Sequence, residues 1–598
     1  MESLPFELYC QVLGWLDAES FVRFGACAPW TYRLMKKPQT KQTLGFTAYS
    51  NRNMEDVARL TSAFTQTLRI TTLRNCHING SWSFLRRCSN LRRFSLSGQW
   101  PVFDMMDLSC LPKLQRIDLE GVDRVLCMHS PNPKKHPSFP RLTHVHLIRS
   151  SLVDLSSFVS LCPHLEELGL WRYENLDLSP LCQLRRLKTL RLNARYLDSI
   201  QPLTRCLGLE HLRFMSFFGM GIPPDDKDVK IFQSIQNLKT LDLGRLRLKD
   251  RDIRGWSLAG SKQLQSLNLR GNDLCDLEWM EHSRLQELIL HANRNLSNIW
   301  SLRTCTHLRV LSLSESRVSS LKSLSHCSRL RKLDLRKCRR LKSVAPLGAC
   351  TQLETLCLTE CVGVTDISPL ALCVRLKVLD ISKTLVQDLE PLSSCTDLRE
   401  LDASVCPRLR ALPGGWSRLR KLTLNECRYL QSFQGLEGCT QLFQLSANNC
   451  AYVQSLDPLA ACTVLEYLSL SGCVRLTHVS CVAHMSRLRE LVLSSCTSLD
   501  ALPPFMRCPL TRLYISNTSV RTLQFLQDVG SRLYCLDIGD TWLEPGWIPA
   551  VLANCPRLRV LHTSQSCPET DTSRFDNTKI VVGMRWRVHA WEGESDSE

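Results

Sequence analysis

Leucine recurs along this chain at short, regular intervals, with polar residues between. The stretch Leu330–Cys350 (LRKLDLRKCRRLKSVAPLGAC) has leucine at its first, fourth and sixth places, cysteine at its ninth, then Pro-Leu and a second cysteine. The stretch that begins at Leu353 repeats these places. A strand that turns its fourth and sixth residues inward exposes its third, fifth and seventh. Because one copy cannot enclose its own leucines, the pattern predicts that copies stack side by side.

This pattern, L-x-x-L-x-L-x-x-N/C, is similar to the leucine-rich repeat, and its period lies within the range of that family. Opening leucines occur in twenty-one copies from Leu91 to Leu558, about 23 residues apart on average. The resemblance implies an α/β solenoid, an arc or horseshoe lined by one parallel concave sheet. So short a repeat leaves room outside for little more than a 3-10 turn. Proline favours such a turn over a long helix, and Pro-Leu recurs at 202–203, 346–347, 369–370, 391–392 and 458–459.

The chain divides into five segments on this reading. Residues 1–37 are outside the repeat, 38–67 form a connector and N-terminal cap, 68–563 form the repeat domain, 564–591 a C-terminal cap and 592–598 an acidic tail. Within the connector we expect a strand at 44–49 and a helix at 54–64. The long intervals 123–141 and 217–237 predict surface loops, 245–263 predicts a longer repeat with a helix, and the alternation at 579–591 predicts a closing strand.

The N-terminal stretch 4–35 (LPFELYCQVLGWLDAESFVRFGACAPWTYRLM) predicts three short amphipathic helices that are too small to be stable alone. It resembles the F-box in its Leu-Pro-x-Glu-Leu start, its aliphatic pair, its Leu-Asp and its later Cys and Trp. It departs from the F-box at Ala28-Pro29, where a basic residue is usual. The alternative is a helical cap on the first repeat. The resemblance implies that the side chains that bind an adaptor are Leu4, Pro5, Leu8, Val12, Leu13, Leu16, Phe21 and Trp30.

Thirty cysteines follow the repeat register rather than a disulfide framework. Eight occupy the ninth place and eleven more stand three residues before an opening leucine, as small buried hydrophobic residues do. Asn272, Ser316 and Thr384 replace cysteine at the ninth place, where a small polar group can meet the backbone of the neighbouring turn. Reduced, buried thiols indicate an intracellular protein, cytoplasmic or nuclear. The chain lacks a C-x-x-C pair, so we expect no metal, and no cofactor is implied.

Several function classes are disfavoured. No apolar run is long enough to cross a membrane, and we expect no signal peptide at the N-terminus. The chain has no G-x-S-x-G, P-loop or H-E-x-x-H motif. Polar side chains on repeated strands are expected to form ladders rather than to converge in a pocket. The protein is therefore expected to be non-catalytic.

The formal net charge of +18 is distributed in two ways. Lys and Arg flank many opening leucines and predict a basic rim, which is either a solvated edge or a partner-binding surface. Outward places of the strands are basic in the first half of the chain and mainly Ser, Thr, Asn, Asp and Glu from Leu353 onward. The basic half predicts a dock for an acidic or phosphorylated protein segment, although ordinary surface polarity is the alternative. Its predicted substrate-binding residues are Arg93, Arg116, His144, His146, Trp171, Arg172, Arg191, His211, Arg213, Arg245 and Arg270.

The resemblance to F-box proteins with leucine-rich repeats implies a function. Such a protein is the substrate-recognition subunit of a Skp–cullin–F-box type ubiquitin ligase, in which the F-box binds a Skp-type adaptor of the cullin core and the repeats hold a protein substrate. A second hypothesis is a non-enzymatic scaffold for protein–protein interaction with no ubiquitin role. A third is nucleic-acid binding through the basic rim, which the rim's lack of interleaved aromatic residues disfavours.

Overall fold

The computed structural model describes residues 46–47, 67–71, 85–86, 88–127, 139–197, 200–214, 235, 237–253, 263–505, 508–543, 551, 553–563 and 579–582. The chain forms two compact units. Unit 1 comprises Met1–Leu274 and Trp279–Leu290, and unit 2 comprises Cys275–Glu278 and His291–Glu598. The predicted adaptor-binding residues, the helix expected at 54–64 and the acidic tail lie outside the described residues.

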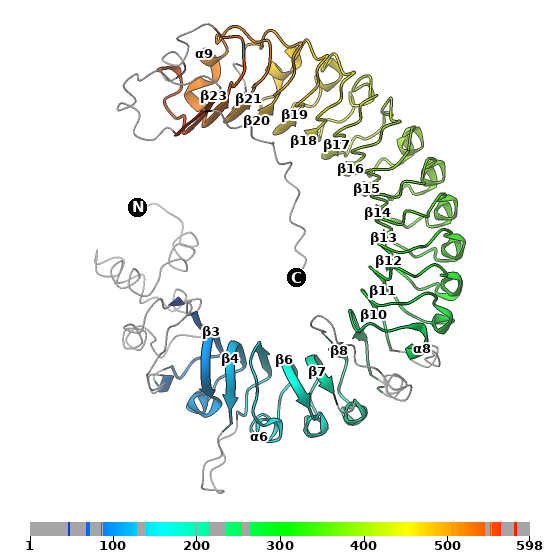
Figure 1. Cartoon of the computed structure of the whole chain (residues 1–598), viewed down its shortest axis with the longest axis vertical. Coiled ribbons are helices and arrows are strands. Elements are labelled where there is room, and N and C mark those ends of the chain that lie inside the picture. The colour runs from blue at the N-terminus through cyan, green and yellow to red at the C-terminus, as the bar shows by residue number, and fades with distance from the viewer. Residues whose placement is uncertain are drawn as a thin grey trace. The chain divides into compact units, whose positions relative to one another are not determined.

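Unit 1 contains eleven described strands, each parallel to the next in chain order. They lie along the inner side of the unit, and the helical turns lie along its outer side (Figure 1). The strands are β1 (Phe46–Thr47), β2 (Thr67–Thr71), β3 (Arg93–Asp104), β4 (Arg116–Leu126), β5 (His144–Ile148), β6 (Glu167–Leu176), β7 (Thr189–Leu197), β8 (His211–Phe214), β9 (Thr240–Asp242), β10 (Ser266–Asn268) and β11 (Glu287–Ile289). The helical turns are η2 (Met105–Leu108), α6 (Leu155–Leu161), η3 (Ser179–Gln183), η4 (Gln201–Arg205) and α8 (Asp250–Ile253). A further turn, η6 (Glu278–Met280), includes residues of both units.

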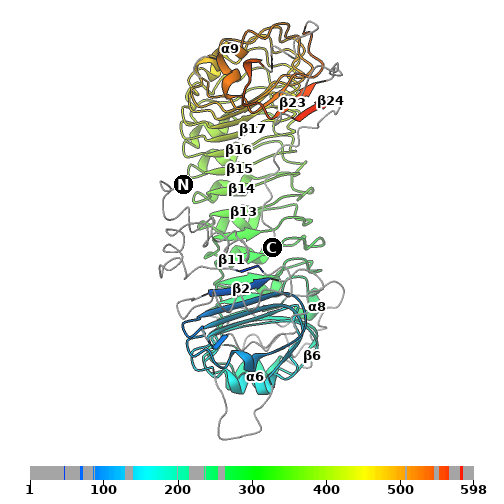
Figure 2. The ribbon, with the colours of Figure 1, turned by 90° about the vertical axis from the view of Figure 1, so that its left-hand side faces the viewer.

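Unit 2 continues the same plan with thirteen described strands, most of them three residues long. Figure 2 shows β13 to β17 stacked in chain order. The strands are β12 (Val310–Ser312), β13 (Lys332–Asp334), β14 (Thr355–Cys357), β15 (Val378–Asp380), β16 (Glu400–Asp402), β17 (Lys421–Thr423), β18 (Gln444–Ser446), β19 (Tyr467–Ser469), β20 (Glu490–Val492), β21 (Arg512–Tyr514), β22 (Cys535–Asp537), β23 (Val560–Thr563) and β24 (Lys579–Val582). The helical turns are η7 (Trp300–Thr304), η8 (Lys322–His326), η9 (Ala345–Ala349), η10 (Ser368–Leu372), η11 (Glu390–Ser394), η12 (Asp457–Leu459), η13 (Ser480–His484), α9 (Leu526–Val529) and η14 (Gly530–Arg532). Among the described residues, no helix has the length and apolar character needed to cross a membrane.

The register confirms the stacking predicted from the leucine pattern. Leu333, Leu356 and Leu379 are direct partners on successive parallel strands, and their side chains are buried. The Pro-Leu pairs lie in η4, η9, η10, η11 and η12, as predicted. The helix expected within 245–263 is present as α8, and the predicted strands at 44–49 and 579–591 are described only as β1 and β24.

In unit 2, the turn after most strands extends the sheet by one hydrogen bond. The residue at the eighth place has a left-handed backbone, with φ of 59° at Lys337 and 60° at Glu360. The Lys337 N–H then donates to the Thr359 carbonyl at 2.7 Å, and the Glu360 N–H donates to the Ser382 carbonyl at 2.9 Å. Lys337 and Glu360 therefore adopt a backbone conformation that usually favours glycine, because this conformation allows a backbone hydrogen bond between repeats.

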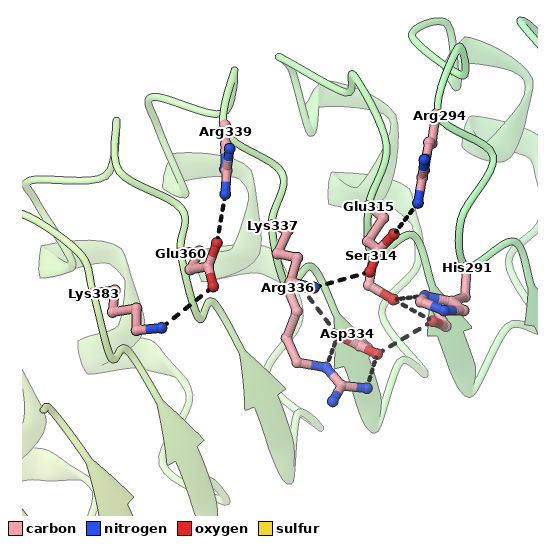
Figure 3. A network of polar contacts seen from close by, with 11 residues as sticks. His291, Arg294, Ser314, Glu315, Asp334, Arg336, Lys337, Arg339, Glu360 and Lys383 are labelled. Atoms are coloured by element: carbon pink, nitrogen blue, oxygen red, sulfur yellow. Dashed lines mark hydrogen bonds and ion pairs between the residues drawn. The ribbon is translucent and has the colours of Figure 1, made fainter. Parts of the chain in front are cut away.

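The same turns of unit 2 display alternating charges at their eighth and tenth places (Figure 3). Glu315 lies between Lys337 at 3.0 Å and Arg294 at 3.4 Å, and Glu360 accepts from Arg339 at 2.8 Å. Hydrogen bonds from these cations lower the pKa of both glutamates. Each exposed pair is worth only about 0–1 kcal/mol, so the row contributes more to register than to stability.

Two rows of buried cysteines run through unit 2. At the ninth place, the Cys361 thiol donates to the Leu335 carbonyl at 3.1 Å. Three residues before the opening leucine, the Cys373 thiol donates to the Leu347 carbonyl at 3.4 Å. Burial raises the pKa of both thiols to about 12. Each thiol thus bonds to the backbone of the preceding repeat, which confirms that the cysteines pack in register.

Candidate binding surface on the inner face of unit 1

The third, fifth and seventh places of each repeat form the exposed inner face of the sheet. In unit 1 this face is hollowed over β6 to β11, with a volume of about 430 Å³. Sequence reasoning expected ladders without a pocket. The hollow forms because Thr and Ser at the third places of β7, β9 and β10 leave space between longer charged neighbours. Its polar lining comes from Glu167, Thr189, Arg191, His211, Arg213, Thr240, Asp242, Ser266, Asn268 and Glu287.

A continuous chain of contacts between basic and acidic side chains crosses β4 to β7 and ends in this hollow. Arg116 Nε lies 2.8 Å from Asp118 Oδ2, and Asp118 Oδ1 lies 3.0 Å from His146 Nδ1. The other ring nitrogen, His146 Nε2, is 3.1 Å from Glu167 Oε1. Arg191 Nη2 approaches the same Glu167 oxygen at 2.9 Å. Arg116 and Arg191 are therefore already paired with carboxylates.

The electrostatics of this chain follow from partial burial. Burial alone would raise the pKa of Asp118, but hydrogen bonds from His146 and Arg116 outweigh it and hold that pKa below its usual value. The hydrogen bond with Asp118 raises the pKa of Arg116. Gly169 provides space here, because a Cβ at this position would lie 3.1 Å from His146 Cδ2 and 3.3 Å from Trp171 Nε1.

The second half of the hollow offers less completely satisfied groups. His211 Nδ1 lies 2.8 Å from Thr240 Oγ1, and Ser266 Oγ donates to Glu287 Oε2 at 2.7 Å. Arg213 Nε lies 3.1 Å from Asp242 Oδ2 without a well-aligned hydrogen bond. Outside the lining of the hollow, the buried Nε of Arg270 has no hydrogen-bond acceptor among the described residues. These donors and acceptors suit the recognition of a polar main chain and side chains.

The predicted substrate-binding residues fall into three groups. Arg191, His211 and Arg213 line the hollow, whereas Arg116 and His146 belong to the charge chain beside it. The remaining residues on or next to the inner face are His144, whose Nε2 is 3.6 Å from Glu167 Oε2, half-buried Trp171 and Arg270, and exposed Arg93.

One predicted residue, Arg245, differs from its expected place, and Arg172 cannot be compared with its expected place. Gly244 occupies the seventh place of its repeat, so Arg245 lies at the eighth, in the turn, with a φ of 63° and an exposed side chain. An eighth-place residue lies beyond the strand, so the Arg245 side chain is not on the inner face. Arg172 lies within β6, and its side chain is outside what the structure describes.

Sequence reasoning missed the acidic residues of this face. Asp118 and Asp242 occupy fifth places, and Glu167 and Glu287 occupy third places, which are the outward positions at which only cations and aromatic residues were noted. A count of both signs at these places would have found them. Among the described residues, no group of three or more His, Cys, Asp or Glu side chains could hold a metal ion.

The inner face of unit 2 is acidic in its middle part. Asp380 and Asp402 are direct partners on the adjacent strands β15 and β16. Burial, together with repulsion from Asp380, raises the pKa of Asp402 even though its Oδ1 accepts the Ser404 N–H at 2.8 Å. In contrast, burial alone would raise the pKa of Asp334, but its hydrogen bonds from Arg336 bring that pKa below the usual value.

We therefore expect Asp402→Asn to stabilise the protein at pH 7. With its folded pKa above its unfolded pKa, ionised Asp402 destabilises the native state at neutral pH, and this penalty disappears as pH falls towards the unfolded value. Asparagine keeps an acceptor for Ser404 and removes the charge, a change of the kind that stabilises by about 0.5–2 kcal/mol. Thermal unfolding followed by circular dichroism at pH 7 and pH 4 measures it, and the gain should shrink at pH 4.

Asp334→Asn is the matched control for this prediction. Its folded pKa is depressed, so its contribution to stability is present above the unfolded pKa and is lost as pH falls through the folded pKa. This variant should be less stable than wild type at pH 7. Equal losses from the two substitutions at pH 7 would contradict the assignment of Asp402 as a penalised charge.

Comparison with known proteins finds similarity to solved structures but no match to a protein family or a curated sequence. The structure of TLR13 in complex with ssRNA13 is 18% identical over 87% of this chain and 84% of that chain, with a TM-score of 0.55. A leucine-rich repeat protein of Leptospira interrogans is 20% identical over 72% and 98% of the two chains, with a TM-score of 0.46. The leucine-rich repeat ectodomain of the receptor kinase GASSHO1/SCHENGEN3 of Arabidopsis thaliana, solved with CASPARIAN STRIP INTEGRITY FACTOR 2, is 16% identical over 90% and 86%, with a TM-score of 0.42.

These likenesses are below 25% identity and concern the fold. In-register leucines on parallel strands, a strand and an outer turn in most repeats, and the similarity to the TLR13 structure agree with one another. In each of the two units, the described residues form a leucine-rich repeat solenoid.

Proposed function

We propose that this protein is a non-catalytic scaffold that binds a protein partner on the inner face of unit 1. The observation that supports this proposal most directly is the hollow over β6 to β11, which joins Arg191 and Arg213 with Glu167, Asp242 and Glu287. Hydroxyl and amide groups from Thr189, Thr240, Ser266 and Asn268 lie between these charges. Donors and acceptors alternate across a shallow surface, which suits a polypeptide segment.

The pairing of charges also indicates the chemistry of the partner. A purely acidic segment would have to displace Glu167 from Arg191 and Asp242 from Arg213. A segment with both acidic and basic side chains can instead join the existing pairs. Complementary charge arrangements of this kind contribute mainly to specificity. We therefore favour a partner segment of mixed charge over the uniformly acidic or phosphorylated one that the cations alone suggested.

A second candidate function adds a ubiquitin role. Its support is the F-box-like sequence at 4–35, in particular Leu4-Pro5 and the apolar positions that follow. In this function a Skp-type adaptor binds the N-terminal segment, a cullin core joins the adaptor, and the repeats hold the substrate. The protein would then act by proximity, because it raises the effective concentration of a substrate lysine near the enzyme that transfers ubiquitin.

One affinity purification from cells, followed by mass spectrometry, tests both functions. The full-length wild type is compared with Arg191→Gln/Arg213→Gln and with the Leu4→Ala/Pro5→Ala variant. The arginine variant should recover about tenfold less partner, since two exposed charged contacts are worth up to about 1 kcal/mol each. The matched control is Arg186→Gln/Arg205→Gln, which removes two exposed arginines of unit 1 outside the hollow.

The outcomes separate the two functions. Loss of adaptor and cullin from the Leu4/Pro5 variant, with the inner-face partner retained, supports the ligase function. Absence of adaptor and cullin from the wild type rejects it and leaves the scaffold. If the two arginine variants recover equal amounts of partner, the inner face of unit 1 is not the binding surface.

A further inference from the structure

The second-place residues of unit 2, which directly follow the opening leucines, form a continuous row along one edge of the sheet. Backbone hydrogen bonds join each residue to the next. The Arg331 N–H donates to the Arg309 carbonyl at 2.8 Å, and the Arg420 N–H donates to the Arg399 carbonyl at 2.8 Å. Over six repeats the row consists of Arg309, Arg331, Glu354, Lys377, Arg399 and Arg420.

Residues just before the opening leucines broaden this row. Arg329, Arg375 and Arg418 add three exposed cations, and Asp397 adds one carboxylate. We call the ten charged residues at these two places between 309 and 420 the basic ridge. It has eight cations and two carboxylates, and all of it belongs to unit 2.

Most of the arginines on the basic ridge are unpaired, unlike Arg116, Arg191 and Arg213 on the inner face of unit 1. Both carboxylates are already used: Glu354 accepts from Lys377 at 2.6 Å, and Asp397 from Arg418. Arg375 donates to Gln352 at 2.6 Å. The remaining guanidinium groups have no hydrogen bond or ion pair among the described residues: Arg309, Arg329, Arg331, Arg399 and Arg420.

We infer that the basic ridge is a second docking surface, which binds an extended protein segment rich in Asp and Glu. Five exposed, unpaired guanidinium groups in one row are complementary to such a segment, since each can hold a carboxylate through two parallel hydrogen bonds. This surface is separate from the hollow of the proposed function.

The dimensions and composition of the basic ridge favour a polypeptide over a nucleic acid. Neighbouring parallel strands are about 4.8 Å apart, so six repeats span roughly 24 Å, the length of about seven extended residues at ~3.3 Å each. Nucleic-acid strands are commonly held by base stacking on aromatic side chains. The ridge, which lies entirely in the described range 263–505, has no aromatic residue at its two places before Phe443.

Fluorescence anisotropy with the full chain tests this inference. The probe is a fluorescein-labelled peptide of six Asp-Glu repeats, with its Asn-Gln counterpart as the uncharged control. We expect the Arg309→Gln/Arg331→Gln/Arg399→Gln/Arg420→Gln variant to bind the acidic probe at least tenfold more weakly than wild type, because several exposed contacts of about 0.2–1 kcal/mol are removed together. Its affinity should also depend less on salt.

The matched control removes four exposed arginines from the opposite edge of the same unit: Arg317, Arg340, Arg408 and Arg428, each changed to Gln. It has the same net charge as the ridge variant and should bind the probe within about twofold of wild type. Equal weakening by both variants would show only a general charge effect and would overturn the inference. So would a single-stranded RNA of equal charge that binds wild type more tightly than the peptide and loses this binding in the ridge variant. Circular dichroism shows whether each variant is folded. If the variant with four substitutions is unfolded, the double variant Arg309→Gln/Arg331→Gln replaces it and should bind the probe at least threefold more weakly than wild type.

Discussion

Replacing Trp416 with alanine should destabilise unit 2 by about 3–5 kcal/mol, the range for large-to-small changes at a buried tryptophan. Trp416 is fully buried, and its Nε1 donates to the Leu392 carbonyl at 3.0 Å. It occupies the place, three residues before an opening leucine, at which the neighbouring repeats have Cys395 and Cys439. The indole fills the outer part of the repeat here, because no helical turn is present between β16 and β18 in this fully described stretch.

Urea unfolding followed by circular dichroism measures this effect. The stability of a repeat depends mainly on its neighbours. The Trp416→Ala variant should therefore show two unfolding transitions: the repeats around position 416 in unit 2 unfold at a lower urea concentration than the remaining repeats. Trp416→Phe is the control: it keeps most of the ring volume, loses the hydrogen bond and should fall between wild type and alanine. If the alanine variant is as stable as wild type, Trp416 is not packed as described.

In unit 1 the largest loss is expected from Asn272→Ala. The buried Asn272 side chain makes four hydrogen bonds with the backbone. Its Oδ1 accepts from the Leu246 and Leu248 N–H groups, both at 3.0 Å, and its Nδ2 donates to the Leu243 carbonyl at 3.0 Å and the Leu269 carbonyl at 2.8 Å. Alanine leaves all four backbone groups without this partner. Because an unmade bond to a buried group costs about 1–3 kcal/mol, the total should be at least about 3 kcal/mol.

Asn268, in the same repeat, provides the control for this prediction. Its side chain is half-buried on the inner face, and its Oδ1 accepts a single bond, from the Arg270 N–H at 3.0 Å. Asn268→Ala should cost about 1 kcal/mol or less. The difference in the free energy of unfolding between the two variants follows from their denaturant midpoints, provided that the free energy depends on denaturant concentration with the same slope in both. Similar midpoints would show that the ninth-place asparagine contributes no more than an ordinary surface amide.

The repeat could be predicted from sequence because a solenoid makes the same contacts in every copy. The places of Leu333 and Leu356 and the thiol position of Cys361 follow directly from the period. Features outside the period could not be predicted in this way. The helix α6 is one such feature: it is capped by Asp154, whose side chain accepts the Ser156 and Ser157 N–H groups.

The candidate site was predicted less well, for two physical reasons. The period places Arg191 and Glu167 on one face, but it gives no distance between side chains, so the pairing at 2.9 Å was unforeseen. A single residue of register also decides whether a side chain lies on the strand or in the turn, as Gly244 and Arg245 show. The adaptor-binding residues, from Leu4 to Trp30, remain a prediction.

The two rows of buried cysteines allow local opening of the solenoid to be measured by the reactivity of their thiols. The thiolate is the form of cysteine that attacks an alkylating reagent. Burial keeps thiols such as Cys361 and Cys373 protonated at neutral pH, with pKa values of about 12. When a repeat separates from its neighbour, the exposed thiol regains ordinary reactivity. Alkylation rates along both rows would therefore give the free energy of opening repeat by repeat, without any label introduced into the chain.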